Sequence, residues 1–270
     1  MNKLLQGKKG LVLGVANEHS IAWHIAKKCW EEGAELASTY QNEKTLRFVQ
    51  PLFESIGSKF YHEMDVTRED SVQVVMGKLR EHFEGELDFI VHSVAGGPKK
   101  GELEGRFIQT SRQGFMDSML ISVFSLNVVL KETLDMLRNR DAAVMTVSYM
   151  GGERVVTNYN IMGVAKAALE SNVRYLAADL GREGIRVNCL SPGTIKTRAA
   201  SGIGAFNQLI EHTAAHSPLR RNATVDEVAK ASLLLLSDWG SGITGETIYV
   251  DAGFHITGVD LPIEEEKDRG

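Results

Sequence analysis

The feature that most constrains this chain is a regular alternation of short apolar runs with longer segments of helical spacing. Seven apolar runs are predicted to be strands, at 10–15, 35–40, 59–64, 87–92, 142–147, 185–190 and 247–250. Helical patterns follow most of them, at 21–32, 43–56, 68–83, 110–137 and 159–180. Unbroken apolar strands that alternate with helices predict a parallel sheet with both faces covered. Because such connections are right-handed, the pattern favours an α/β fold with a single doubly wound, Rossmann-type domain and a seven-stranded parallel sheet.

Composition places the chain among ordinary globular proteins, with 270 residues, 43% hydrophobic and 24% charged. We expect residues 1–258 to form one dinucleotide-binding catalytic domain and residues 259–270 to form a charged C-terminal tail. A net charge of -5 argues against a general nucleic-acid or membrane binder. The sequence shows no signal peptide and no apolar run near the roughly 20 residues of a membrane span. We therefore expect a cytoplasmic protein, or one in an organelle after removal of a targeting peptide.

The cysteines and histidines do not have the spacing of a metal site. Cys29 and Cys189 lie far apart in the sequence, and we expect two buried, reduced thiols, with a long-range disulfide as the alternative. The eight histidines are scattered without the pattern of a catalytic triad or a zinc site. His92 is interpreted as a packed or capping histidine rather than a base. No metal site is predicted.

The turn after the first strand has features of a phosphate-binding loop. Gly14 lets the chain turn closely, and Ser20 is a suitable N-cap for a helix that begins at Ile21. Exposed amides at such a helix N-terminus favour a pyrophosphate. The segment lacks the three glycines of a G-x-G-x-x-G motif, so an ordinary capped loop is the alternative.

The end of the second strand bears on the choice of nucleotide. Gln41 lies where this fold tests the adenosine ribose, and a neutral amide can hydrogen-bond both hydroxyls without repelling a 2′-phosphate. Lys44 and Arg47 follow within two helical turns. The sequence therefore predicts NADH as cofactor and leaves NADPH open. After the third strand, Asp65 and Val66 could hold the adenine, with an N-cap role for Asp65 as the alternative.

Two irregular segments follow strand ends, where ligands bind in open parallel sheets. Ser93-Val94-Ala95-Gly96-Gly97 opens the segment 95–105, and its small residues allow a backbone to approach a ligand closely. The segment 191–203 follows the sixth strand and is rich in small residues. Both are candidate walls or lids of a binding site.

Tyr159 and Lys166 stand seven residues apart on a predicted helix, so they share one face about 10 Å apart. A phenol there can hydrogen-bond a carbonyl oxygen that gains negative charge, and the lysine can hold cofactor hydroxyls. By itself this pair could equally be a surface tyrosine and a solvated lysine.

The wider pattern resembles a known family. Tyr149, Tyr159 and Lys166 form Tyr-x9-Tyr-x6-Lys, and Gly14-x5-Ser-Ile-Ala follows the first strand. This combination resembles the NADH-dependent enoyl-acyl-carrier-protein reductases of bacterial fatty acid synthesis, a divergent branch of the short-chain dehydrogenase/reductases. Most of that superfamily places lysine four residues after tyrosine, where this chain has Gly163. The resemblance implies reduction of trans-2-enoyl thioesters carried on acyl carrier protein, by a homotetramer.

The resemblance also assigns roles to individual residues. It implies that Tyr149, Tyr159 and Lys166 are catalytic. It implies cofactor-binding positions at Gly14, Ser20, Ile21, Gln41, Asp65, Val66, Ser93, Val94, Ala95, Ile121, Lys166 and Ile195. It implies an acyl pocket formed by Ala95, Leu103, Tyr149, Tyr159, Met162, Ile203 and Phe206. The long helices 110–137 and 159–180 are the expected packing surfaces of the tetramer.

The chain departs from the family pattern at Gly96-Gly97, where relatives carry a bulkier residue and then alanine, so we expect a wider pocket. The segment 194–215 is expected to be a lid that is mobile without ligand and becomes ordered with NAD and substrate. Two alternatives remain: a carbonyl reductase of the same superfamily, and a non-catalytic NAD-binding sensor. The absence of lysine at Gly163 argues against the first alternative, and the presence of both Tyr159 and Lys166 argues against the second.

Overall fold

One seven-stranded sheet organises the computed structural model, which describes residues 3–196 and 205–259. The strand order is β3-β2-β1-β4-β5-β6-β7, and every neighbouring pair is parallel. The strands are β1 Lys9–Leu13, β2 Glu35–Tyr40, β3 Phe60–Glu63, β4 Phe89–His92, β5 Ala143–Val147, β6 Arg186–Pro192 and β7 Thr247–Val250. The predicted α/β fold and parallel sheet are confirmed, with strand bounds within two residues of the sequence pattern.

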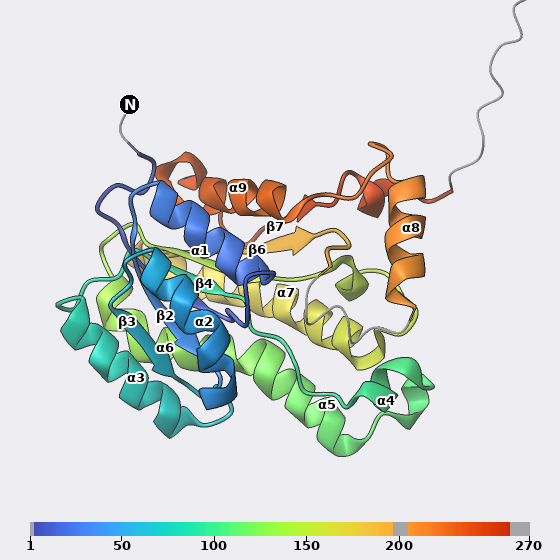
Figure 1. The fold of residues 1–270 in the computed structure, drawn as a ribbon, viewed down its shortest axis with the longest axis horizontal. Coiled ribbons are helices and arrows are strands. Elements are labelled where there is room, and N and C mark those ends of the chain that lie inside the picture. Colours follow the sequence, from blue (N-terminus) through green and yellow to red (C-terminus); the bar gives the residue numbers. More distant parts are fainter. Residues whose placement is uncertain (1–2, 197–204, 260–270) are drawn as a thin grey trace, which may run out of the picture.

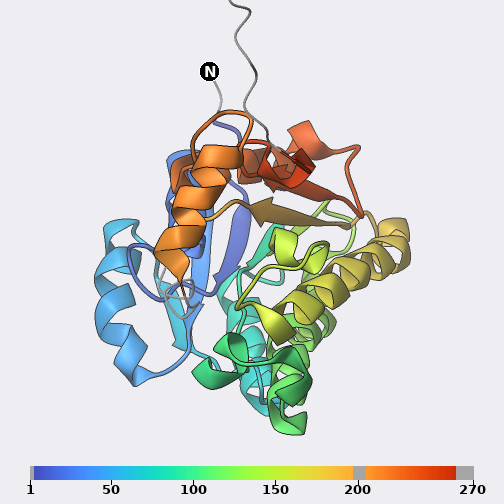
Figure 2. The ribbon, with the colours of Figure 1, turned by 90° about the vertical axis from the view of Figure 1, so that its right-hand side faces the viewer.

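Helices cover both faces of the sheet (Figures 1 and 2). Those that share a core with Leu11 and Leu13 are α3 Glu69–His82, α6 Ser125–Leu137 and α7 Asn160–Leu180. Those that pack with Val12 on the other face are α1 Ile21–Glu31, α2 Glu43–Ser55 and α9 Val225–Leu236. Successive β1 residues point to opposite faces, so an unbroken apolar run is what a strand between two helical layers requires.

The strand order reverses between β1 and β4, which creates the crevice where a doubly wound sheet binds its ligand. The two chain segments leaving these strands lie very close together. Gly14 has a φ of +96°, and a Cβ there would stand 2.0 Å from the Ser93 carbonyl oxygen. Only glycine fits both the backbone conformation and the space.

The predicted helix 110–137 differs from the observed one. Helical structure begins at Arg112, after Ser111 caps it by accepting from the Gly114 amide. It runs through α5 Arg112–Met119, a π-helical turn η2 Leu120–Phe124, and α6. A π-turn inserts one extra residue, so no 3.6-residue pattern reveals it. A short helix, α4 Lys100–Glu104, also lies inside the segment that the sequence left irregular.

One helix, Arg112–Leu137, is long and apolar enough to span a membrane by length and composition, contrary to the expectation from the sequence. In the fold it is one of the sheet-covering helices. Its second half contributes Leu126, Val129 and Leu137 to the core, each fully buried. This burial accounts for part of its apolar composition, while Phe115, Met116 and Phe124 of the same helix are exposed.

Candidate active site

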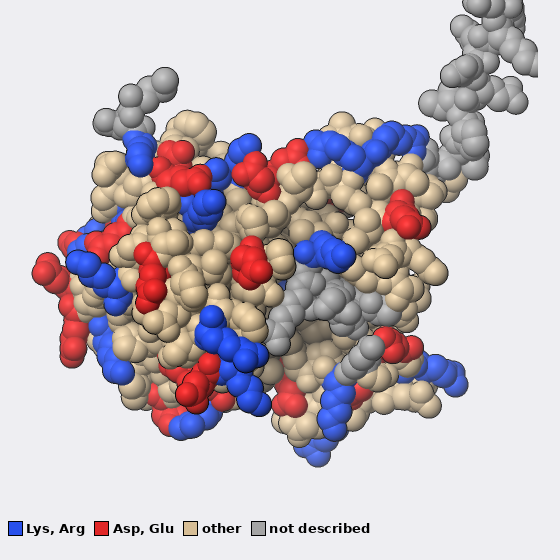
Figure 3. All heavy atoms as spheres, in the orientation of Figure 1, with Lys and Arg blue, Asp and Glu red and all other residues tan. Residues whose placement is uncertain are grey.

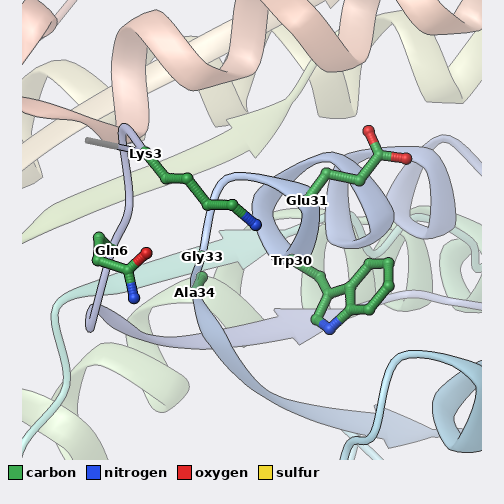
Figure 4. A pocket seen from close by; sticks show the side chains of 6 residues that line it. All are labelled: Lys3, Gln6, Trp30, Glu31, Gly33 and Ala34. Carbon is green, nitrogen blue, oxygen red and sulfur yellow. The ribbon is translucent and has the colours of Figure 1, made fainter. Parts of the chain in front are cut away.

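The candidate site lies at the carboxyl edge of the sheet, where the loops after β1 to β6 converge. The helices α4 and α8 Phe206–His216 lie at this end of the molecule, on the right of Figure 1. A separate groove of about 420 Å³ lies near the start of the chain and the end of α1 (Figure 4). That groove, lined by Lys3, Gln6 and Trp30 among others, is at the amino edge of the sheet and belongs to no predicted site.

The loop after β1 leaves the N-terminus of α1 available to an anion. Ser20 is the N-cap by position, but its hydroxyl accepts from the Ala16 and Asn17 amides at 3.0 Å each and caps no helical amide. Ser20 is thus the predicted N-cap residue of α1, and its side-chain oxygen is used by the loop rather than by a helical amide. The first turn of α1, which begins at Ile21, carries no acidic residue. Its free amides and helix dipole suit a pyrophosphate.

An exposed side-chain amide, that of Gln41, follows the end of β2. Gln41 is exposed just beyond β2, and the next residue, Asn42, caps α2 by accepting from the Thr45 amide at 3.1 Å. The Arg47 guanidinium lies over the Phe48 ring, 4.6 Å from its centroid. Arg47 is thus engaged with its own helix.

Asp65 and Val66 follow β3 and are both partly buried. The Asp65 carboxylate accepts from the Thr67 amide at 2.9 Å and from the Thr67 hydroxyl at 2.7 Å. The N-cap of α3 is instead Arg68, so the N-cap alternative for Asp65 is wrong. The aspartate forms a local turn, which fixes the backbone at Val66.

The segment after β4 is fastened to the π-turn. The Gly96 amide donates to Ser122 Oγ at 3.2 Å, and Ser122 Oγ donates to the Gly96 carbonyl at 3.1 Å. A Cβ on Gly96 would meet only Ile121 Cγ2, at 3.6 Å, so there is room for a side chain. Gly97 has a φ of +120°, and its Cβ would stand 2.4 Å from the Ser118 nitrogen. Glycine at 96 thus leaves space, while glycine at 97 is required by the backbone. Ser93, Val94 and Ala95 lie on this same segment, with Ala95 exposed.

Tyr149 and Tyr159 form an edge-to-face pair, with ring centroids 5.0 Å apart and planes at 66°. Tyr149 follows β5, and its hydroxyl lies 3.5 Å from Thr194 Oγ1. Tyr159 directly precedes α7, between Asn158 and Asn160 in left-handed conformations. Burial raises the pKa of both phenols. Both are therefore protonated donors at neutral pH.

Lys166 lies on α7 and is only 4% exposed. Its Nζ donates to the Val147 carbonyl at 2.7 Å, at the end of β5. Burial lowers its pKa to about 8. One turn further along α7, Glu170 accepts from the Ser148 hydroxyl. Burial raises the pKa of Glu170.

The structure explains why the lysine cannot stand four residues after Tyr159. A Cβ on Gly163 would lie 2.7 Å from the Gly151 carbonyl oxygen. The opposing atom is backbone, so it cannot move aside as a side chain would. A long side chain at 163 is excluded, and the lysine that α7 buries stands at 166 instead.

The structure describes all but one of the residues expected to form the acyl pocket. Met162 is buried on α7, and Leu103 on α4 is partly buried. Phe206 begins α8 and is partly buried. Ile203 lies outside the described residues, as do 197–204 of the expected lid. Ile195 is described and is partly buried beyond β6.

Sequence reasoning missed several residues that build the site. Asn160 donates from Nδ2 to the carbonyls of Glu102 and Gly105, at 2.9 and 2.8 Å, and so ties α4 to α7. Ser122 and Thr194, described above, were also missed. Their partners are distant in sequence, so no local pattern signals them. Only asparagine next to Tyr159 carried a signal, because asparagine tolerates left-handed backbone.

Within the described ranges, no group of His, Cys, Asp or Glu side chains could hold a metal ion. Cys29 and Cys189 are both buried and free, which excludes the disulfide alternative in this structure.

Comparison with known proteins identifies the family. The sequence matches the family described as Enoyl-(Acyl carrier protein) reductase over residues 14–255. The chain belongs to that family. It is 47% identical over 253 residues to the NADH enoyl-acyl-carrier-protein reductase FabI of Neisseria meningitidis, covering 93% of this chain and 96% of that protein.

Solved structures of family members have the same fold. The enoyl-acyl-carrier-protein reductase (NADH) of Aquifex aeolicus superposes with a TM-score of 0.92 at 45% identity, covering 95% of this chain and 100% of that one. The reductase of Anaplasma phagocytophilum, solved in complex with NAD, gives a TM-score of 0.91 at 44% identity, covering 97% and 99%.

The residues present fit a dinucleotide. The uncapped N-terminus of α1 would hold the pyrophosphate, and Gln41 would meet the adenosine ribose. Buried Lys166 would hold the nicotinamide ribose.

Proposed function

We propose that this chain reduces the trans-2 double bond of enoyl thioesters carried on acyl carrier protein, with NADH as the hydride donor. The observation that carries this is the Tyr149–Tyr159 pair together with buried Lys166 at the carboxyl end of β5, with position 163 closed to lysine. This is the arrangement that the family resemblance requires. The names of the relatives, which are NADH enoyl reductases, support it.

Bound NADH supplies the hydride, which adds to C3 of the enoyl thioester. Negative charge then develops on the thioester oxygen. The Tyr159 phenol donates a hydrogen bond to that oxygen, and its raised pKa keeps the proton on the tyrosine before reaction. Tyr149 contacts the ring of Tyr159 and limits its rotation. The resulting enolate takes a proton at C2 from water, which gives the saturated thioester.

Lys166 positions the cofactor. Its ammonium has three donors, of which one is used by the Val147 carbonyl. The remaining two are available to the hydroxyls of the nicotinamide ribose. Fixing that ribose fixes the hydride donor relative to Tyr159, and positioning of this kind contributes strongly to rate.

NADH is favoured over NADPH by the neutral Gln41. The preference is moderate, because the residue directly after β2 is the neutral Gln41 and not a carboxylate that would repel a 2′-phosphate. Arg47, which the sequence left as a possible phosphate ligand, contacts Phe48 instead.

A homotetramer is supported by exposed apolar side chains on the expected packing helices. These are Phe115 and Met116 on α5, Phe124 on η2, and Val164 and Tyr175 on α7. Exposed apolar surface of this kind favours burial against another subunit. On the face shown in Figure 3, acidic and basic side chains are interspersed over most of the surface. We place the enzyme in the cytoplasm. Mobility of the lid 194–215 remains a prediction.

NADH oxidation with crotonyl-CoA and with acetoacetyl-CoA tests the proposal. Rapid oxidation with crotonyl-CoA alone is the expected result. Oxidation with acetoacetyl-CoA alone would instead support a carbonyl reductase. Tight NADH binding without oxidation of either substrate would support the sensor. Light scattering that showed a monomer at micromolar concentration would contradict the tetramer.

A further inference from the structure

A buried histidine outside the reaction chemistry connects the sheet to the π-turn beside the cofactor site. His92 ends β4 and is 0% exposed. Its Nε2 lies 2.9 Å from Ser125 Oγ, and its Nδ1 lies 3.3 Å from Thr146 Oγ1. A histidine that is fully enclosed and contacts polar atoms through both nitrogens does more than fill space.

Ser125 takes over a hydrogen bond that the π-turn removes. The Ser125 amide donates to the Leu120 carbonyl, five residues back, rather than to the Ile121 carbonyl four residues back. Ser125 Oγ donates to the Ile121 carbonyl instead, at 2.7 Å. The side chain thus satisfies a carbonyl that the widened turn leaves without its usual α-helical partner.

Counting protons assigns the state of His92. Four contacts form the network: Thr146 Oγ1 to the His92 carbonyl, Thr146 Oγ1 to Nδ1, Nε2 to Ser125 Oγ, and Ser125 Oγ to the Ile121 carbonyl. Each hydroxyl has one proton to donate. Neutral imidazole adds a third proton, and only the imidazolium would supply a fourth.

The imidazolium is excluded at neutral pH. Burial and the nearby charge of Lys166 lower the pKa of His92 to about 3. With three protons for four contacts, one contact lacks a proton. We expect it to be the longest one, between Nδ1 and Thr146 Oγ1 at 3.3 Å. His92 then carries its proton on Nε2 and donates to Ser125, whose own proton must point at Ile121.

The π-turn in turn holds the loop after β4. Ser122 follows Ile121, and its hydroxyl makes two hydrogen bonds with Gly96. It accepts from the Gly96 amide and donates to the Gly96 carbonyl. Gly96 and Ile121 are neighbours, since a Cβ on Gly96 would stand 3.6 Å from Ile121 Cγ2. The family resemblance places Ile121 at the cofactor, so the Gly96 loop borders the same site. A displacement of the π-turn would therefore also displace the backbone at Gly96, through the hydrogen bonds of Ser122.

We propose that His92 is a positioning residue: its Nε2–H orients the Ser125 hydroxyl, which fixes the π-turn and through Ser122 holds the Gly96 wall of the cofactor site. This role rests on the proposed NADH-dependent function. It predicts that loss of the His92 donor weakens cofactor binding although His92 itself touches no cofactor atom.

Three single variants, one double variant and one control test the proposal. His92→Phe and Ser125→Ala each remove one link, and we expect each to raise the Kd for NADH about tenfold, the scale of one lost hydrogen bond. Their effects should not add in the double variant, because His92 acts on the Ile121 carbonyl only through the Ser125 hydroxyl. His92→Gln can place an amide donor near the Nε2 position and should restore the Kd to within about threefold of wild type. Thr133→Val is the matched control, because Thr133 is buried on the same helix and bonds the Val129 carbonyl away from the π-turn.

The outcomes separate positioning from simple packing. A role in packing alone would lower the Tm of His92→Phe and leave the Kd for NADH unchanged in the folded protein, which would overturn the proposal. In ¹⁵N NMR spectra at pH 7, His92 should be the neutral Nε2–H tautomer, and an Nδ1–H tautomer would also overturn it. An inactive wild-type enzyme that binds NADH with normal Kd would count against the proposed function, while the Kd comparisons among variants would still decide the role of His92.

Discussion

Gly151→Ala is expected to damage catalysis by displacing the ring of Tyr159. A Cβ on Gly151 would lie 2.6 Å from Tyr159 Cδ1 and 2.9 Å from Cε1. Ordinary carbon contacts begin at about 3.5 Å, so the ring must move by about 0.9 Å. The backbone of Gly151 is not in the left-handed region, so the substitution adds no conformational strain of its own. Misplacement by about 1 Å costs roughly 100-fold in rate, or about 2.7 kcal/mol of barrier.

Steady-state NADH oxidation with crotonyl-CoA measures the effect. We expect kcat to fall about 100-fold with the Kd for NADH nearly unchanged, since Gly151 faces the tyrosines. In a Tyr159→Phe background the same substitution should have little further effect on kcat, because the hydroxyl it displaces is already absent. Gly77→Ala is the control: no heavy atom lies within 4 Å of its Cβ, and it should stabilise α3 by about 0.5–1 kcal/mol without changing kcat. A Gly151→Ala enzyme with kcat within about twofold of wild type would refute the assignment of the Tyr159 hydroxyl to the reacting oxygen.

Four further expectations concern charge, specificity and strain. Tyr159→Phe should raise the activation barrier by about 3–4 kcal/mol, and so lower kcat, with little change in NADH affinity. Unchanged turnover would show that Tyr159 is not the hydrogen-bond donor to the thioester oxygen. Because Lys166 has a pKa of about 8 in the free protein, its ammonium is present below that pH and lost above it, so kcat/KM for NADH should decline as pH rises through about 8. A profile flat to pH 10 would mean that the charge of Lys166 does not contribute. Gln41→Arg should shift the ratio of kcat/KM values toward NADPH, as measured with both cofactors side by side. Ala252 has a φ of +60°, so Ala252→Gly should raise Tm by about 1–3 °C in calorimetry, and a lowered Tm would show that this backbone is not strained.

The sequence by itself determined the fold class. Unbroken apolar strands require two covering layers, and helices between them leave a parallel sheet as the simplest arrangement. The spacing of Tyr159 and Lys166 predicted a single helix for both, but α7 begins at Asn160 and Tyr159 is its N-cap, so their pairing stays a prediction. Glycine ends two of the predicted helices as expected, since Gly33 and Gly57 have φ values of +92° and +66°.

Other features depend on contacts between residues distant in the sequence. Ser20 is a helix cap by composition, but the Ala16 and Asn17 amides of its own loop take its oxygen. The π-turn adds a residue that no periodicity marks, and its hydrogen bonds are completed by Ser125 with His92 on β4.

Lysine stands at 166 rather than 163 for a reason that only the tertiary structure shows, since the Gly151 carbonyl occupies the space beside position 163. Local propensity and pattern fix which elements form, because they depend on near neighbours along the chain. The tautomer of His92, the space beside position 163 and the position of the Gly96 loop depend on contacts between strands and helices that are distant in the sequence. Those contacts form only when the sheet assembles.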